Sequence, residues 1–472
     1  MPNRTKFFRH RASLCAVFLL LCPLFLTLTT AQSLPEARRE TLLNGLRVVL
    51  WPRPNDGNIL LRLRIHSGAA FDLAGKSGTM GLLSDVLFYD PATREAVEKD
   101  YGGKLLVTVN HDALDITITG EGDVLLPLVN VIRSAIININ PLPENERILA
   151  LRAARVKLLS APPTPSSSAD EAALKRFFGA FPYARNSAGV AADAATLDRN
   201  DLIFLRERFL NPNNATLIIA GNFNPNRAYL ITRQLLGNWR KSDAVVPSTF
   251  RQPETPDERV LLVNQADASE AQVRLLLRGV ARNDKDYLAL TLLAAIAQTR
   301  WQTALGDLPA GFLNVRQDAR TLPGFFLMSG KTPPEDAAKA LSAARATLEA
   351  LAADGPSADE LQRARNALIT QLNKRLADPE SVAEIWLDAD TYRLTPFADQ
   401  LRGLNNLTPS DLKKTAFRLF RAVPAASVAL GPLERMRPEI EKTARVEVLG
   451  EKPLPTPTPT TPNILGKPKP KP

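Results

Sequence analysis

Two stretches of the sequence decide the fold: DLIFLRERFLNPNNATLIIAG at Asp201–Gly221 and DLKKTAFRLFRAVPAASVALG at Asp411–Gly431. In each stretch a helical pattern begins at an aspartate, and a short apolar run ends at a glycine 20 residues later. A strand that ends at Gly68 is matched by one that ends at Gly279. The offsets between the matched segments are 210 and 211 residues, which indicates an internal duplication.

Strand and helix patterns alternate within each of the two repeats. Extended runs at Leu46–Leu50 and Ile59–His66 are typical of strands, and Leu105–Val109 and Ala113–Thr119 are typical of an antiparallel pair. Helix starts are expected where a hydroxyl precedes an acid by three residues, at Thr332, Ser357 and Thr408. The predicted fold class is α+β, with two homologous halves, each a mostly antiparallel sheet covered by helices, forming a clam-like chamber.

The chain divides by composition. Its 472 residues are too many for one core. A Pro-rich patch at 246–258 is the predicted linker between an N-terminal lobe, 32–245, and a C-terminal lobe, 259–451. Proline, threonine and lysine dominate 452–472, which predicts a solvated, disordered tail.

The N-terminus has the pattern of a secretory signal. Four basic residues between Arg4 and Arg11 precede an apolar run, Leu14–Leu28, and small residues then lead to Ala31. The alternative is a membrane anchor, but the run is shorter than the ~20 residues that a span needs. We therefore expect a signal peptide at 1–31, cleaved near Ala31, and export to the periplasm or the extracellular space.

Charge and cysteine content exclude two classes of function. The formal charge is +10, but the leader and the tail carry most of the excess, so the folded body is near +2 and nucleic-acid binding is not expected. Both cysteines, Cys15 and Cys22, lie in the leader. The processed chain would therefore have neither a disulfide nor a thiol nucleophile.

Several short motifs resemble those of one peptidase family. They are Leu43–Val49, Tyr101–Gly103, Phe181–Tyr183 and Asn211–Phe223, and their order and spacing are similar to those of the insulinase or pitrilysin-type metallopeptidases. That family carries an inverted zinc motif, His-x-x-Glu-His, on a helix. Residues at i, i+3 and i+4 share one helical face, so two histidines can bind zinc while the glutamate activates water.

The matching helix has lost this motif. The stretch Gly78–Phe88 aligns with it and places Gly81, Ser84 and Asp85 at the His, Glu and His positions. The family's third ligand is a glutamate on a later helix, and the matching stretch Leu151–Leu158 contains no acid; Lys157 is the best alignment there. We expect Lys157 to repel a cation and to be a candidate partner of Asp85. The resemblance therefore implies a non-catalytic member without metal or cofactor.

Other candidate residues follow from the same resemblance. Arg300 aligns with a family arginine that contacts substrate, with a structural ion pair as the equally weighted alternative. Phe312 lies where the family has a substrate-contacting tyrosine. His66 and His111 are the only histidines outside the leader, and we interpret them as ordinary strand or turn residues rather than metal ligands.

Three functions are compatible with this pattern. The favoured hypothesis is the non-catalytic, substrate-contacting subunit of a two-chain peptidase, whose partner is a zinc-bearing homologue and whose ligands are peptides or unfolded segments. The alternative is a stand-alone peptide-binding or scaffold protein of the periplasm or cell surface, holding peptides at a sheet edge. An enzyme with another site is the third. Against it, Gly75–Ser77 and Gly330–Thr332 echo a phosphate loop but lack its first glycine.

Overall fold

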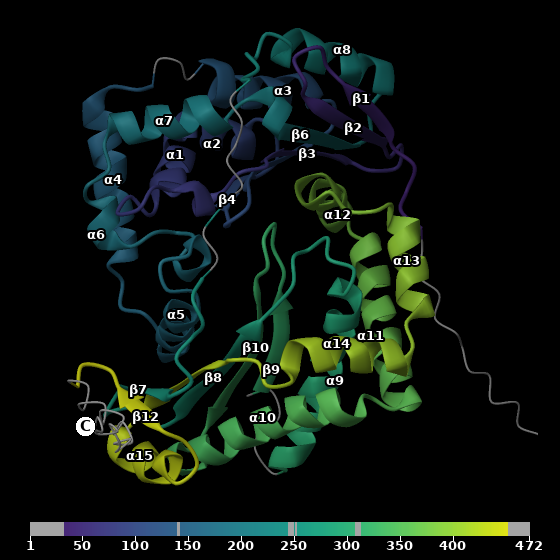
Figure 1. The fold of residues 1–472 in the computed structure, drawn as a ribbon. Helices are drawn as coiled ribbons and strands as arrows, with labels where there is room; N and C mark the ends of the chain where they lie inside the picture. The colour runs from purple at the N-terminus through teal and green to yellow at the C-terminus, as the bar shows by residue number, and fades with distance from the viewer. Residues whose placement is uncertain (1–32, 139–141, 244–249, 251–252, 307–312, 452–472) are drawn as a thin grey trace, which may run out of the picture.

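The computed structural model describes residues 33–138, 142–243, 250, 253–306 and 313–451. It shows two six-stranded sheets, one from each half of the chain, facing each other with helices around and between them (Figure 1). The predicted signal peptide and tail lie outside the described residues, as does most of 246–252 in the predicted linker. None of the helices in the described ranges combines the length and apolarity that a membrane span requires.

The first half builds its sheet in the order β1-β2-β6-β3-β5-β4. Only the β2–β6 pairing is parallel, so the sheet is mostly antiparallel as predicted. The strands are β1 (Arg38–Thr41), β2 (Arg47–Pro52), β3 (Asn58–Ile65), β4 (Leu105–Val109), β5 (Leu114–Glu121) and β6 (Ala215–Gly221). The helices are α1 (Thr79–Leu87), α2 (Pro91–Lys99), α3 (Leu125–Arg133), α4 (Asn145–Leu159), α5 (Pro165–Phe178), α6 (Ala191–Ala194), α7 (Arg199–Phe209) and α8 (Pro225–Leu236).

The second half repeats this topology. Its sheet has the order β12-β7-β11-β8-β10-β9, so β7 to β11 take the places of β2 to β6 and β12 takes the outer place of β1. The strands are β7 (Val260–Asn264), β8 (Ala271–Arg278), β9 (Leu313–Asp318), β10 (Phe325–Thr332), β11 (Ala426–Gly431) and β12 (Val446–Val448). The helices are α9 (Tyr287–Leu305), α10 (Ala337–Asp354), α11 (Ala358–Leu376), α12 (Pro379–Tyr392), α13 (Phe397–Asn406), α14 (Pro409–Phe420) and α15 (Leu433–Glu441). The shared strand order confirms the predicted pair of homologous halves.

Helix starts follow the capping chemistry in two of the three predicted places. Ser357 and Thr408 each form a complete capping box with the acid three residues later. The prediction at Thr332 is wrong, because Thr332 is the last residue of β10 and α10 begins at Ala337. Pairing with β8, in which Thr332 lies opposite Ala271, holds the chain extended there, so the sheet overrides the local signal.

Each sheet buries both faces, in different ways. The outer face of each sheet packs against helices of its own half and forms the two larger apolar cores. The inner face of each sheet packs against a helix of the other half: α5 of the first half lies on β8 and β11, and α12 of the second half lies on β3 and β6 (Figure 1). We call α5 and α12 the crossing helices. Because each half contributes one helix to the sheet of the other, these two helices hold the halves together.

Candidate functional site

The helix that aligns with the zinc motif is α1, and its start is held by a buried carboxylate. Asp72 accepts hydrogen bonds from the backbone N–H of Gly78 at 2.7 Å and of Met80 at 2.9 Å. Burial raises the pKa of Asp72 to about 6, although these N–H donors pull it down. Gly78 has a φ of +97°, which favours glycine. Asp72 and Gly78 therefore determine where α1 begins.

The space beside the motif positions on α1 is filled by a side chain from another helix. The Arg155 guanidinium, from α4, makes an ion pair with Asp85 through Nε at 2.7 Å and donates from Nη2 to the Gly81 carbonyl at 2.7 Å. A Cβ added at Gly81 would overlap Nη1 of Arg155. Ser84 is buried and donates to the Gly81 carbonyl at 2.6 Å. The space beside the two former histidine positions is thus occupied by a cation.

This geometry corrects the expected role of Lys157. Lys157 is exposed and makes no ion pair within the described part of the chain, whereas Arg155, two residues earlier on the same helix, pairs with Asp85. Two residues correspond to about 200° of helix rotation, so the two side chains point to nearly opposite faces. Sequence reasoning chose the right helix and the right kind of charge but the wrong face, because the hydrophobic periodicity of Leu151–Leu158 is too weak to fix its phase.

The residues at this face do not fit a zinc ion. Asp85 is the only anionic side chain among the three motif positions, and its carboxylate already pairs with an arginine. In the described ranges, no three His, Cys, Asp or Glu side chains come together in a way that could hold a metal. We therefore derive no metal-dependent step for this chain.

The two histidines lie in separate, buried positions. His66 follows β3, and its ring nitrogens bond the hydroxyls of Thr391 at 2.9 Å and Thr216 at 3.0 Å. Burial, reinforced by Arg47 and Arg64, lowers the pKa of His66 to about 3. His111 bonds the Arg185 carbonyl at 2.8 Å, and burial lowers its pKa to about 4. Both rings are satisfied by non-metal partners.

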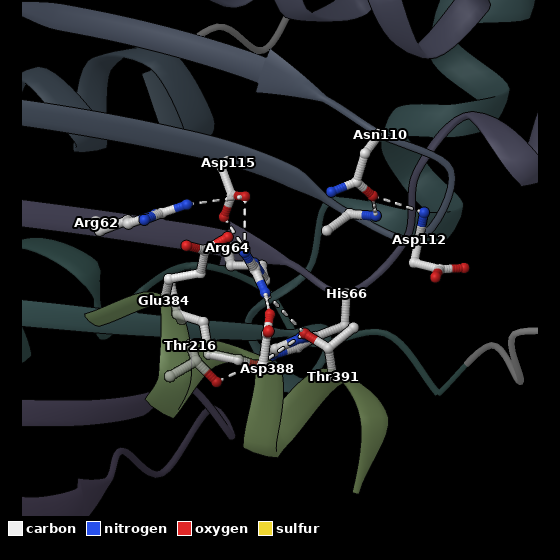
Figure 2. Close-up of polar contacts among 12 residues, drawn as sticks. Arg62, Arg64, His66, Asn110, Asp112, Asp115, Thr216, Glu384, Asp388 and Thr391 are labelled. Carbon is white, nitrogen blue, oxygen red and sulfur yellow. Dashed lines mark hydrogen bonds and ion pairs between the residues drawn. The ribbon is translucent and has the colours of Figure 1, made fainter. Parts of the chain in front are cut away.

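A charged network beside His66 joins the two halves (Figure 2). Arg64 of β3 has a side chain only 3% exposed and binds Asp115 of β5 at 2.7 Å and Asp388 of α12 at 2.7 Å. Burial opposes its charge, but the two carboxylates hold the pKa of Arg64 above its usual value. No sequence motif pointed to this network, because its members come from three segments more than 50 residues apart.

The two predicted substrate contacts have different outcomes. Arg300 on α9 makes a bidentate pair with Glu360 on α11, at 2.7 and 2.8 Å, and donates to the Gly355 carbonyl at 3.0 Å. This arrangement matches the structural alternative, an ion pair that joins two helices. Phe312 lies outside the described residues, so its predicted contact stays a prediction.

The comparisons with known proteins agree with this geometry. Residues 196–368 match a family model described as the peptidase M16 inactive domain. This part of the chain is therefore similar to the inactive domain of M16-type, or insulinase-type, peptidases. A search of curated proteins found no sequence match. The matched region runs from α7 through β6 to α11 and includes β7 to β10.

Solved structures of two proteases and of a peptidase M16 inactive domain share the fold over most of the chain. A protease from Helicobacter pylori is 19% identical with a TM-score of 0.76, and covers 84% of this chain and 100% of its own. A peptidase M16 inactive domain from Pseudomonas fluorescens is 18% identical with a TM-score of 0.72, covering 84% and 98%. The first half of the periplasmic protease PqqL from Escherichia coli is 16% identical with a TM-score of 0.68, covering 89% and 100%. In the comparison with the whole of PqqL, the match covers 90% of this chain and 52% of the PqqL chain.

Proposed function

We propose that this M16 homologue is the non-catalytic, peptide-contacting subunit of a two-chain peptidase, whose zinc is supplied by a homologous partner. The observation that carries the proposal is the guanidinium of Arg155 on the former metal face, where it pairs with Asp85 and bonds the Gly81 carbonyl. A cation in that place opposes zinc binding. The chain has the fold of these peptidases, but Gly81, Ser84 and Asp85 on α1 supply neither the two histidine ligands nor the glutamate base of the zinc motif.

The likeness to PqqL supports a partner of the same fold. The whole of PqqL is a periplasmic protease in one chain, and this homologue matches about half of it. A second chain of two halves would supply the remainder. We propose that the partner carries the zinc motif, that export follows from the signal pattern at 1–31, and that this subunit binds no metal of its own.

An exposed sheet edge supports contact with peptides. The strand β4 is the last in its sheet and pairs only with β5 among the described strands. Leu106 and Thr108 on it are exposed, and Leu106 is 57% accessible. An extended peptide can add to such an edge through main-chain hydrogen bonds. The same edge also favours the second candidate, a stand-alone peptide-binding or scaffold protein.

Metal content and peptide hydrolysis distinguish the two candidates. The full processed chain is purified alone and after co-expression with a zinc-bearing homologue from the same organism. For the two-chain peptidase we expect a stable complex, no zinc in the lone chain, and hydrolysis only by the pair. A partner variant without its general-base glutamate is the control and should assemble without activity.

The opposite outcomes are equally informative. Failure to form a complex at micromolar concentrations, with peptide binding retained, would favour the stand-alone protein. Stoichiometric zinc with chelator-sensitive cleavage by the lone chain would overturn both candidates, and the search would turn to His66 and His111.

Restoring the motif residues is a further test of the same proposal. The triple variant Gly81→His, Ser84→Glu and Asp85→His should gain neither zinc nor activity, because α4 supplies an arginine and no acid at this face. Zinc-dependent proteolysis after these three changes alone would show that our interpretation of α4 is wrong.

A further inference from the structure

A pocket lies between the two halves, away from the α1 face. Its volume is about 460 Å³, within the range of ~300–1,000 Å³ that is typical of ligand pockets. The first half contributes Arg47, His66 and Tyr183, and the second contributes Arg320, Tyr392 and Arg393. Interfaces between structural units are preferred places for small-molecule sites. We call it the inter-half pocket.

The acceptors in this pocket are already occupied. Asp112 accepts the Tyr183 hydroxyl at 3.0 Å and the Thr321 backbone N–H at 3.1 Å. Asp390 accepts the Thr216 hydroxyl at 2.7 Å and pairs with Arg47 at 3.0 Å. His66 is held between two threonine hydroxyls. Both acidic side chains of the lining, Asp112 and Asp390, therefore already have protein partners.

The donors in the pocket are not all occupied. Nη1 of Arg320 is buried without a hydrogen-bond partner, while its Nε and Nη2 bind Asp318 at 2.6 and 3.0 Å. A buried donor without an acceptor is costly, and this applies to Nη1 of Arg320. Among the described residues, the half-buried Tyr392 hydroxyl and the exposed Arg393 guanidinium also line the pocket without a hydrogen bond to another protein group. Together these donors favour a ligand made of acceptors.

One of these donors, Arg393, has a strained backbone conformation. Arg393 ends α12 with φ +53° and ψ +51°, a left-handed conformation that favours glycine or asparagine. Only one other non-glycine residue in the described chain has a positive φ. Backbone strain of this kind persists where the surroundings hold it, and it gathers at binding sites. Here it sets a guanidinium at the rim of the inter-half pocket.

We propose that the inter-half pocket binds a carboxylate carried on a small apolar or aromatic body. The carboxylate has only acceptors and can take up the spare N–H groups of Arg320 and Arg393 together with the Tyr392 hydroxyl. The aromatic rings of Phe71 and Tyr183, which also line the pocket, supply contact for the body. The free C-terminus of a peptide and a small organic acid share this chemistry.

Three probes separate these sources. N-acetylphenylalanine, its C-terminal amide, and the peptide acetyl-Ala-Ala-Phe are titrated calorimetrically into the full processed chain without a partner. We expect the two acids to bind with dissociation constants between ~10 µM and ~1 mM, and the amide to bind at least ~10-fold more weakly. Tighter binding of the peptide acid would assign the pocket to peptide ends, and tighter binding of the amino acid would assign it to small acids.

A variant of the rim tests the residue itself. Arg393→Asn removes the guanidinium but keeps a residue that tolerates the left-handed conformation, and it should weaken acid binding at least ~10-fold. Arg393→Lys should retain part of the affinity. Arg402→Asn, on the exposed surface of α13 outside this pocket, is the matched control and should bind like the unchanged chain.

Two results would overturn the proposal. One is equal affinity for acid and amide, and the other is no binding of any probe at ~5 mM, about five times the weakest dissociation constant expected. This proposal extends the proposed function but uses the lone chain. Absence of a zinc-bearing partner would therefore leave the pocket measurement unchanged, and absence of acid binding would leave complex formation untouched.

Discussion

The two crossing helices occupy similar places in the two halves, and each combines apolar contacts with a buried arginine–aspartate pair, but the side chains around these pairs differ. Helix α5 rests on the second sheet through an aromatic cluster that includes Phe177, Phe178 and Phe325. Helix α12 rests on the first sheet partly through Trp386 and partly through the Arg64–Asp388 pair and the Thr391–His66 bond. Both junctions also contain a buried arginine–aspartate pair, Arg274–Asp170 at α5 and Arg64–Asp388 at α12. The α12 junction differs in its hydrogen-bonded histidine, His66, whose protonation in the unfolded chain makes this junction the one that acid loosens first.

The largest effect is expected at the aromatic junction. Phe178→Ala removes a fully buried ring that contacts Phe181, Tyr183 and Phe325. The free energy of unfolding should fall by about 3–5 kcal/mol, as for other buried phenylalanines. Chemical denaturation measures this change. The control Phe417→Ala, at a ring that is 48% exposed, should change it by less than ~1 kcal/mol. A small loss at Phe178 would mean that α5 is not a main anchor.

The next largest effect is expected at the junction between α12 and the first sheet. Arg64→Met removes the cation between Asp115 and Asp388 and leaves Asp115, 5% exposed, without its closest partner. We expect a loss of about 3 kcal/mol in the free energy of unfolding. Adding Asp115→Asn should recover part of it, because the buried charge is then gone. No recovery in the double variant would show that Arg64 acts by packing rather than by charge.

The pH dependence sharpens the same comparison. The pKa of His66 is about 3 in the folded chain and near 6.5 when unfolded, so the unfolded state binds more protons as the pH falls below 6.5. The contribution of neutral His66 to the free energy of unfolding is therefore fully present above pH 6.5 and is lost as the pH falls toward 3. At pH 5 the loss is about 1–2 kcal/mol. Acid should expose α12 to hydrogen exchange before α5.

A variant isolates this contribution. His66→Gln keeps a side chain that can bond Thr391 and Thr216 but does not titrate, and its stability should fall less between pH 7 and pH 5 than that of the unchanged chain. His111, with a pKa of about 4, adds a fall of the same sign and remains in both proteins. Equal pH profiles for the two proteins would exclude His66 as the source.

The fold could be predicted from the sequence because the same helix–strand pattern occurs in both halves. The helix–strand pattern that ends at Gly221 recurs at Gly431, and both ends close central strands of the observed sheets. The loss of the zinc motif was also visible, since Gly81 carries no side chain. The sequence did not show that α5 and α12 each pack on the sheet of the other half. A hydrophobic pattern indicates which face of a helix is buried, but not which sheet that face contacts.

The site chemistry was harder to predict, for a related reason. Arg155 and Lys157 are both cations in one stretch, and only the phase of α4 decides which one faces Asp85. The Arg64 network and the inter-half pocket join segments from both halves, so no local spacing announces them. Position in three dimensions was needed wherever the partner residues are distant in the chain.

The smallest effect is expected where an arginine joins two helices within one half rather than two halves. Gly81→Ala should favour α1 by about 1 kcal/mol through helix propensity, but its methyl group displaces Arg155 and disturbs the pair with Asp85. We therefore expect almost no net change in the unchanged background and a gain of about 1 kcal/mol when Arg155→Ala is also present. Denaturation of the four proteins of this cycle measures the coupling. An equal effect of Gly81→Ala in both backgrounds would show that Arg155 does not fill the former metal face.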